Sequence, residues 1–229
     1  MCKSLTPYML VFGPIVMMAG FIMSPELEDL LGQAYLSKVK SLDMNMTLLT
    51  TFTSAFGILM LFGGLFLLSQ DLMANSGKMQ QDMLMMSRLG FMFAFTVFYL
   101  FFGMQLESIS IAQGGNDIYA DDSALSDETA LDLHYMAENI WSSLPIALCF
   151  ALILFGSAAV TGNNSPKEPI EWVYGLPILG GLGMMAIFWV EEGFGLFLFA
   201  MFSSVPTGIL MLTGHLKDTG AEPENSEEA

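Results

Sequence analysis

The chain has 229 residues and carries 23 acidic against seven basic side chains, which gives a formal net charge of −16. Only 13% of the residues are charged, where a soluble domain usually has about 25%, whereas 54% are hydrophobic and the mean hydropathy is +0.58. This composition excludes an ordinary soluble domain, a disordered chain and a disulfide-rich secreted domain. The chain also lacks the clustered Lys and Arg that nucleic-acid binding requires. The composition instead predicts a polytopic membrane protein surrounded by a lipid bilayer.

Six stretches are long and apolar enough to cross the membrane as helices, for which about 20 residues span a roughly 30 Å hydrocarbon core. They are apolar on all sides and do not alternate as the strands of a membrane barrel would. The predicted spans are residues 5–23, 47–68, 88–112, 140–161, 172–190 and 194–214. The sequence therefore predicts an all-α bundle of six transmembrane helices over residues 1–217. The acidic tail, residues 218–229, is expected to be disordered.

The first loop is expected to hold a short amphipathic helix that lies on the outer surface. Pro25 stands where the first turn of a helix tolerates a proline. Apolar residues then follow at helical spacing and predict one buried face: Leu27, Leu30, Leu31 and Ala34.

A longer helix is predicted ahead of the fourth span. Ser126 is a suitable N-cap, acids follow it in the first turn, and no Gly or Pro lies between Asp127 and Trp141. We therefore expect one continuous helix from about residue 127 to 161, rising out of the membrane. Such a helix places His134 and Glu138 one turn apart on the same face.

The distribution of basic residues predicts the orientation, because loops on the cytoplasmic side carry an excess of Lys and Arg. With six crossings, both termini and the second and fourth loops share one side. That side holds Lys3, Lys78, Arg88, Lys167 and Lys217, whereas the other holds Lys38 and Lys40. Both termini are therefore expected to be cytoplasmic, in a cell membrane.

Five ionisable residues are expected near the outer end of the bundle. Glu107 lies late in the third span, His134 and Glu138 precede the fourth, and Glu191 and Glu192 form the turn between the fifth and sixth. Carboxylates with one imidazole suit a proton or a cation such as Ca²⁺, Zn²⁺ or Mn²⁺. The alternative is that acids at the membrane edge simply face water. Neither a particular metal nor a cofactor can be assigned from these residues.

Glu107 stands out because it is the one acid placed within an apolar span and not in a turn or loop. If it is shielded from water, it is expected to be the most functionally sensitive ionisable residue of the chain. The alternative is that its side chain reaches the membrane surface or hydrogen-bonds to Ser108 or Ser110.

The last spans are rich in small and helix-breaking residues. Gly180, Gly181 and Gly183 follow Pro177 in the fifth span. Pro145 in the fourth span and Pro206 in the sixth are further candidates for kinks. Small residues let helices pack closely in lipid, and interrupted helices often border ion or solute sites. Close packing alone is sufficient to explain the pattern.

Methionine is frequent, with 20 residues, and thioethers can bind Cu(I). The two cysteines and two histidines that would complete a copper site are far apart in the sequence. Flexible apolar packing is therefore the preferred interpretation.

Two classes of function fit these features. The first is a non-catalytic subunit or accessory protein of a membrane assembly, because buried polar residues are scarce. The second is a small channel or transporter for a cation or proton with an acidic outer vestibule. Both allow a homo-oligomer or other membrane proteins as partners. Enzymatic activity is disfavoured, because no nucleophile motif accompanies either histidine.

Overall fold

The computed structural model describes residues 5–25, 27, 30–115, 122–190 and 193–216, so the predicted tail lies outside the described residues. The regular elements of the described ranges are all helical, and six of them are long and apolar enough to cross a membrane. This confirms the all-α fold of a multi-pass membrane protein. The elements are α1 (Thr6–Met23), α2 (Gly32–Lys40), α3 (Met44–Met73), α4 (Lys78–Ala112), α5 (Ser123–Trp141), α6 (Leu144–Ala159), η2 (Gly162–Asn164), η3 (Pro169–Gly175), α7 (Leu176–Ala186), η4 (Ile187–Trp189), α8 (Phe194–Phe202) and α9 (Val205–Leu212).

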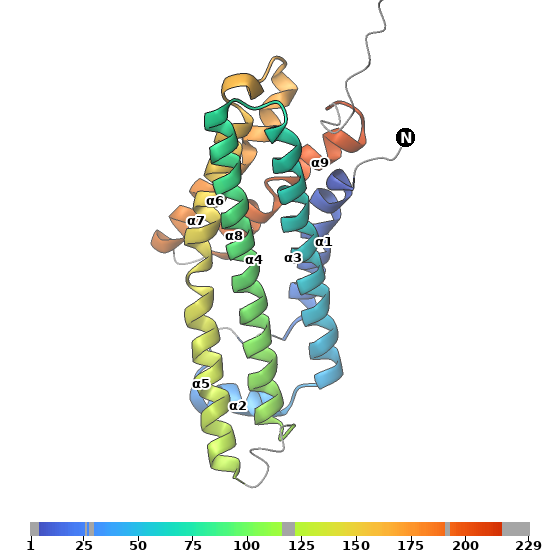
Figure 1. The fold of residues 1–229 in the computed structure, drawn as a ribbon. Coiled ribbons are helices and arrows are strands. Elements are labelled where there is room, and N and C mark those ends of the chain that lie inside the picture. Colours follow the sequence, from blue (N-terminus) through green and yellow to red (C-terminus); the bar gives the residue numbers. More distant parts are fainter. Residues whose placement is uncertain (1–4, 26, 28–29, 116–121, 191–192, 217–229) are drawn as a thin grey trace, which may run out of the picture.

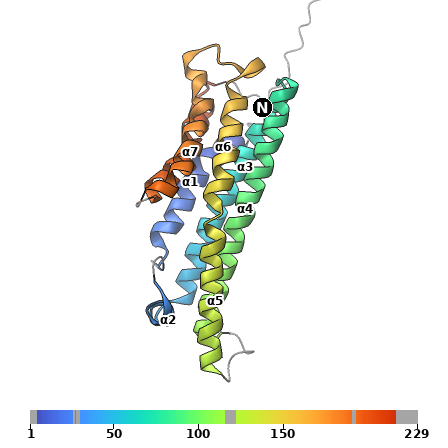
Figure 2. The same ribbon diagram turned by 90° about the vertical axis from the view of Figure 1, so that its left-hand side faces the viewer.

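The helices differ greatly in length, and this divides the molecule into two parts (Figures 1 and 2). α1 has 18 residues, which at a rise of 1.5 Å is about 27 Å and matches the hydrocarbon core. α3 has 30 residues and α4 has 35, so they are about 45 and 52 Å long and exceed it. At the end away from the α3–α4 turn, part of this extra length packs with α2 and α5. We call this part the extension (residues 32–47, 105–112 and 123–139).

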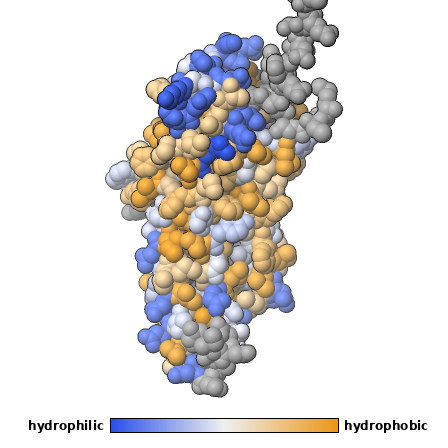
Figure 3. All heavy atoms as spheres, in the orientation of Figure 1, coloured by the Kyte–Doolittle hydropathy of each residue, from blue (hydrophilic) through white to orange (hydrophobic). Residues whose placement is uncertain are grey.

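Apolar residues form a belt around the middle of the molecule, and hydrophilic residues gather towards its ends (Figure 3). Trp172 and Trp189 are 60% and 77% exposed at opposite ends of the fifth span. Helical rise separates them by about 26 Å, close to the core thickness, as expected of aromatic residues at the two membrane interfaces. The belt is therefore the surface that contacts the lipid bilayer.

Two apolar clusters hold these parts together. The larger one lies between the six spans and the smaller one fills the extension. The smaller cluster consists of Tyr35, Leu36, Val39, Ile109, Ile111, Ala112 and Ala130, with Leu27 and Leu30 packed against it.

The short helix of the first loop is present but begins later than the sequence predicted. α2 starts at Gly32, whose φ of +53° lies in the left-handed region. A right-handed helix beginning near Pro25 cannot continue through such a residue. Leu27 and Leu30 therefore precede the helix and pack against its apolar cluster. Leu31 and Ala34, also expected on the buried face, are exposed, and that face consists of Tyr35, Leu36 and Val39.

The continuous helix predicted over residues 127–161 is interrupted, ends at Ala159 and has a different cap. Asp122, and not Ser126, accepts the first amide protons of α5, from Ala124 and Leu125. The break follows Trp141, whose carbonyl loses its helical donor because Pro145 has no N–H. The helix is unbroken between His134 and Ile140, so the shared face of His134 and Glu138 remains.

A Ser-Ser-x-Pro sequence marks this break and a second one between α8 and α9, at Ser203. At both breaks a serine hydroxyl donates to a carbonyl three residues earlier: Ser142 to Asn139, Ser143 to Ile140, and Ser203 to Ala200. Pro145, Pro177 and Pro206 each lie in the first turn of the helix that follows, where a missing N–H has no helical partner to lose.

Glycines bring α1 and α3 into backbone contact. Gly13 on α1 and Gly57 on α3 face each other, so a Cβ on Gly13 would lie 2.5 Å from the amide nitrogen of Leu61. A Cβ on Gly57 would collide with the amide nitrogen of Met17. Gly20 and Gly64 continue the contact one heptad further on each helix. We call these four glycines the glycine seam.

The glycines of α7 differ in their packing. A Cβ on Gly180 would meet the Ser203 hydroxyl at 2.9 Å, and one on Gly181 would meet the Cys149 carbonyl at 2.8 Å. Around Gly183 the nearest atom, in Phe199, lies at 3.7 Å, which is ordinary van der Waals distance. Neighbouring helices therefore pack closely against Gly180 and Gly181, whereas Gly183 has room for a side chain.

The glycine seam yields a test with a matched control. Gly57→Ala should destabilise the protein by about 1–3 kcal/mol, because the added methyl forces two backbones apart. Gly103 lies within α4, and a Cβ there would have no neighbour within 4 Å. Gly103→Ala should therefore be neutral, or stabilise the protein by up to about 1 kcal/mol because alanine favours the helix. The thermal midpoint of each variant in detergent measures the difference. Equal midpoints for the two variants would show that the seam does not determine stability.

Candidate functional site

The structure brings two of the five predicted site residues together and separates a third. His134 and Glu138 lie one turn apart on α5 and share a partner on α4. Glu107 is exposed on α4 and is not shielded within the apolar span. Glu191 and Glu192 lie outside the described residues. The described part of the chain contains no group of three His, Cys, Asp or Glu side chains that could hold a metal ion.

Gln105 on α4 links the two residues. Its side-chain nitrogen lies 3.1 Å from Nδ1 of His134 and 3.1 Å from Oε1 of Glu138. The other ring nitrogen of His134, Nε2, lies 3.3 Å from the carbonyl of Leu30 in the first loop. His134 is only 2% exposed, so these partners take the place of water.

The partners determine which atoms carry protons. The Leu30 carbonyl can only accept, so Nε2 of His134 must donate. In the neutral ring Nδ1 is then an acceptor, and the Gln105 amide supplies one hydrogen to it and the other to Glu138. The geometry therefore fits a neutral His134 with its proton on Nε2. Both nitrogens of the ring are in use, so the ring has no lone pair directed at a metal.

A second chain of hydrogen bonds lies beside this network. Tyr35 of α2 stacks on the His134 ring with 3.9 Å between centroids and 14° between planes. Its hydroxyl lies 2.7 Å from that of Ser108, which donates at 2.6 Å to the carbonyl of Ala130. Because Ser108 has a single hydroxyl proton, Tyr35 must be the donor to it. Burial raises the pKa of Tyr35, and the hydrogen bond to Ser108 lowers it by less, so the phenol keeps its proton.

Further contacts hold α2 across the end of the bundle. The amide of Gln113, just after α4, donates to the carbonyls of Val39 and Leu42 at 2.8 and 2.9 Å. Val39 lies in the last turn of α2 and Leu42 in the loop that follows, so one amide joins both to the end of α4. Lys40 and Asp127 form an exposed ion pair at 2.6 Å, which is a weak contribution because both side chains are partly solvated.

Sequence reasoning missed Gln105, Tyr35 and Ser108. The helical period of α4 could have identified two of them as neighbours on one face. Gln105 and Ser108 are three residues apart and share a face, whereas Glu107 is rotated by about 200° from Gln105. Glu107 therefore lies on a different face of α4 from Gln105 and Ser108.

Comparison with protein-family models, with curated proteins and with solved structures yields no match to this chain. The geometry of the extension and of the spans is thus what bears on function.

The role of Gln105 can be tested by replacing it with methionine, which has a similar shape but no donor. Gln105→Met should destabilise the protein by about 1–3 kcal/mol, because Nδ1 of His134 and Oε1 of Glu138 both lose a donor. The same substitution at Asn139, an exposed neighbour on α5, should change stability by less than about 0.5 kcal/mol. Chemical unfolding in detergent gives both values. A small effect at Gln105 would mean that water replaces the amide without loss.

Proposed function

We propose that the protein is a non-catalytic subunit or accessory protein of a membrane assembly. The observation that carries this proposal is that no Asp, Glu, Lys or Arg of the described residues is fully buried, and that the buried polar residues of the spans are mostly Ser and Thr. The largest fully buried side chains within the spans are aromatic and aliphatic, among them Leu10, Met17, Leu61, Phe91, Phe98 and Phe155. Residues 89–104 of α4, about 24 Å of helix, contain no Asp, Glu, Lys, Arg or His. A cation pathway would need polar groups along this depth.

The surface of α4 supports the same function. Large apolar side chains on its outer face are exposed: Met85, Met86, Leu89, Met92 and Phe93. Methionine adapts its shape to different neighbours, which suits a face that packs against lipid tails and against helices of a partner. The extension adds a folded, hydrogen-bonded part outside the membrane, through which a partner can also be contacted.

The alternative is a channel or transporter for a cation or proton, and one experiment separates the two. A photo-crosslinking amino acid at Met92 or Phe93 should give a discrete band with another membrane protein in native membranes. The same group at Phe91, which is buried, serves as the control. Purified protein in liposomes should pass neither cations nor protons. A homo-oligomer whose ion flux falls on Glu138→Gln, with no crosslinked partner, would overturn the proposal.

We also propose that both termini are cytoplasmic. An even number of spans gives both ends the same side, and α9 packs at Gly208 against the Pro7 carbonyl in the first turn of α1. The excess of Lys and Arg on that side supports the cytoplasm. A cysteine tag after Ala229 should not react with an impermeant thiol reagent in intact cells, and should react after permeabilisation. Labelling of intact cells would reverse the orientation.

A further inference from the structure

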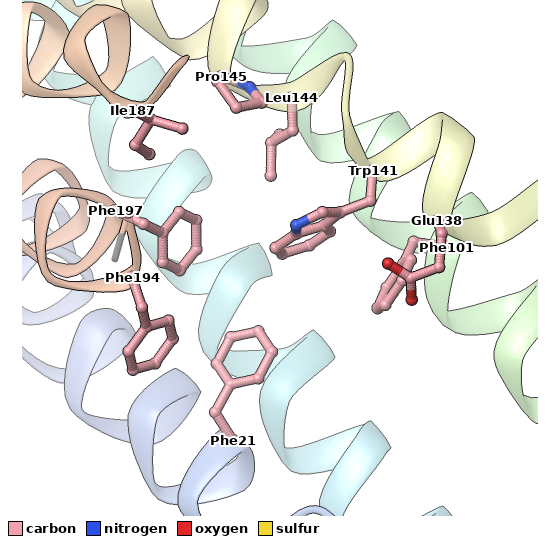
Figure 4. Close-up of a pocket in the computed structure, with 10 residues that line it drawn as sticks. Phe21, Phe101, Glu138, Trp141, Leu144, Pro145, Ile187, Phe194 and Phe197 are labelled. Carbon is pink, nitrogen blue, oxygen red and sulfur yellow. The ribbon is translucent and has the colours of Figure 1, made fainter. Parts of the chain in front are cut away.

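A cavity of about 270 Å³ lies where the extension meets the membrane-spanning part. Its wall contains five aromatic side chains from four helices, Phe21, Phe101, Trp141, Phe194 and Phe197, together with the carboxylate of Glu138. Figure 4 shows the rings of Phe21, Trp141 and Phe197 around a common space, with Glu138 beside Phe101 at its edge. Ligand pockets usually begin at about 300 Å³, so this cavity suits a compact group.

The aromatic rings hold one another in place. Trp141 lies 4.7 Å from Phe101 and 5.8 Å from Phe197, and Phe21 meets Phe197 edge-on at 6.4 Å, measured between centroids. Tilted and edge-on contacts fix the orientation of the rings, and the faces that remain uncovered carry the negative part of the ring quadrupole. A cation within about 6 Å of such faces is attracted by them.

Glu138 supplies the negative charge at the edge of this cavity. Gln105 donates to its Oε1, which fixes the position of the carboxylate while leaving its charge in place. A small inorganic cation such as Ca²⁺ needs six to eight oxygen ligands, and the aromatic wall offers none. A cation whose charge is spread over methyl groups needs no oxygen cage, and aromatic rings with one carboxylate meet its requirements.

The cavity lies close to one membrane interface. Trp141 is at the end of α5, and Ile187 of the lining is two residues from the exposed Trp189 at the membrane interface. Phe194, at the rim, is 54% exposed, so the cavity can be reached from this interface. Lipid headgroups and water-borne solutes are both present at that depth.

We propose that this cavity binds a quaternary ammonium group of the trimethylammonium type, with Glu138 as its counter-ion and Trp141 and Phe197 as aromatic walls. The group belongs either to a choline lipid or to a free choline-like solute. This binding goes beyond the assembly role above and does not depend on it.

The test for a free solute uses the full chain in a maltoside detergent, which carries no choline. Choline should raise the thermal midpoint in a saturable manner, because a ligand that binds only the folded state stabilises it. The neutral isostere 3,3-dimethyl-1-butanol should not. Glu138→Gln, which keeps an acceptor for Gln105, should weaken choline binding by about tenfold or more. Glu107→Gln, an acid on another face of the bundle, should leave it unchanged.

The lipid arm uses nanodiscs made from equal parts of phosphatidylcholine and phosphatidylglycerol. If the lipid is the source, detergent extraction should leave phosphatidylcholine bound to the wild type and not to Glu138→Gln, as measured by mass spectrometry. Either a choline effect or selective lipid retention supports the proposal and identifies the source. If Glu138→Gln does not fold, the proposal is tested on the wild type alone. The two measurements are then the response to choline against that to its neutral isostere, and the selectivity for phosphatidylcholine. Equal responses to both solutes and no lipid selectivity would overturn the proposal.

Discussion

The hydrogen bonds of the backbone are the constraint on which the structure depends, because a polar group left without a partner in hydrocarbon costs several kcal/mol. Helices satisfy this requirement internally except at their ends, at breaks and at an interior proline such as Pro14 of α1. At the breaks before α6 and α9, serine hydroxyls donate to carbonyls three residues earlier. At the end of α2, outside the hydrocarbon core, the amide of Gln113 serves two carbonyls in the same way. The serine hydroxyls at the breaks thus supply donors to carbonyls in the last turn of the preceding helix.

Once the backbone is satisfied, helices in lipid are held together chiefly by close packing. The glycine seam removes side chains where α1 crosses α3, so that the two backbones touch at Gly13 and Gly57. Gly208 of α9 meets Leu10 of α1 in the same manner, so α1 has glycine contacts to two neighbours. The extension is held together in a different way. Buried polar side chains there form hydrogen bonds that cross between elements.

Much of this fold could be predicted from the sequence, because span length and apolar content report directly on the membrane. The bundle, the six spans and the shared face of His134 and Glu138 are of this kind. The predictions that were wrong or missing depend on single atoms or on contacts between residues distant in the sequence. The missing N–H of Pro145 breaks the predicted long helix, the left-handed Gly32 delays α2, and the partnership of Gln105 with His134 joins residues 29 apart. Periodicity identifies which residues share a face, but not which element that face meets.

The extension and the cavity are joined through Glu138. On one side its carboxylate accepts from Gln105, which also contacts His134. The His134 ring in turn ties α5 to the carbonyl of Leu30 in the first loop and to the stacked Tyr35. On the other side the same residue lies in the wall of the aromatic cavity together with α1 and α8. The carboxylate in the wall of the cavity therefore belongs to the same group of hydrogen-bonded side chains that holds α2 against α4 and α5.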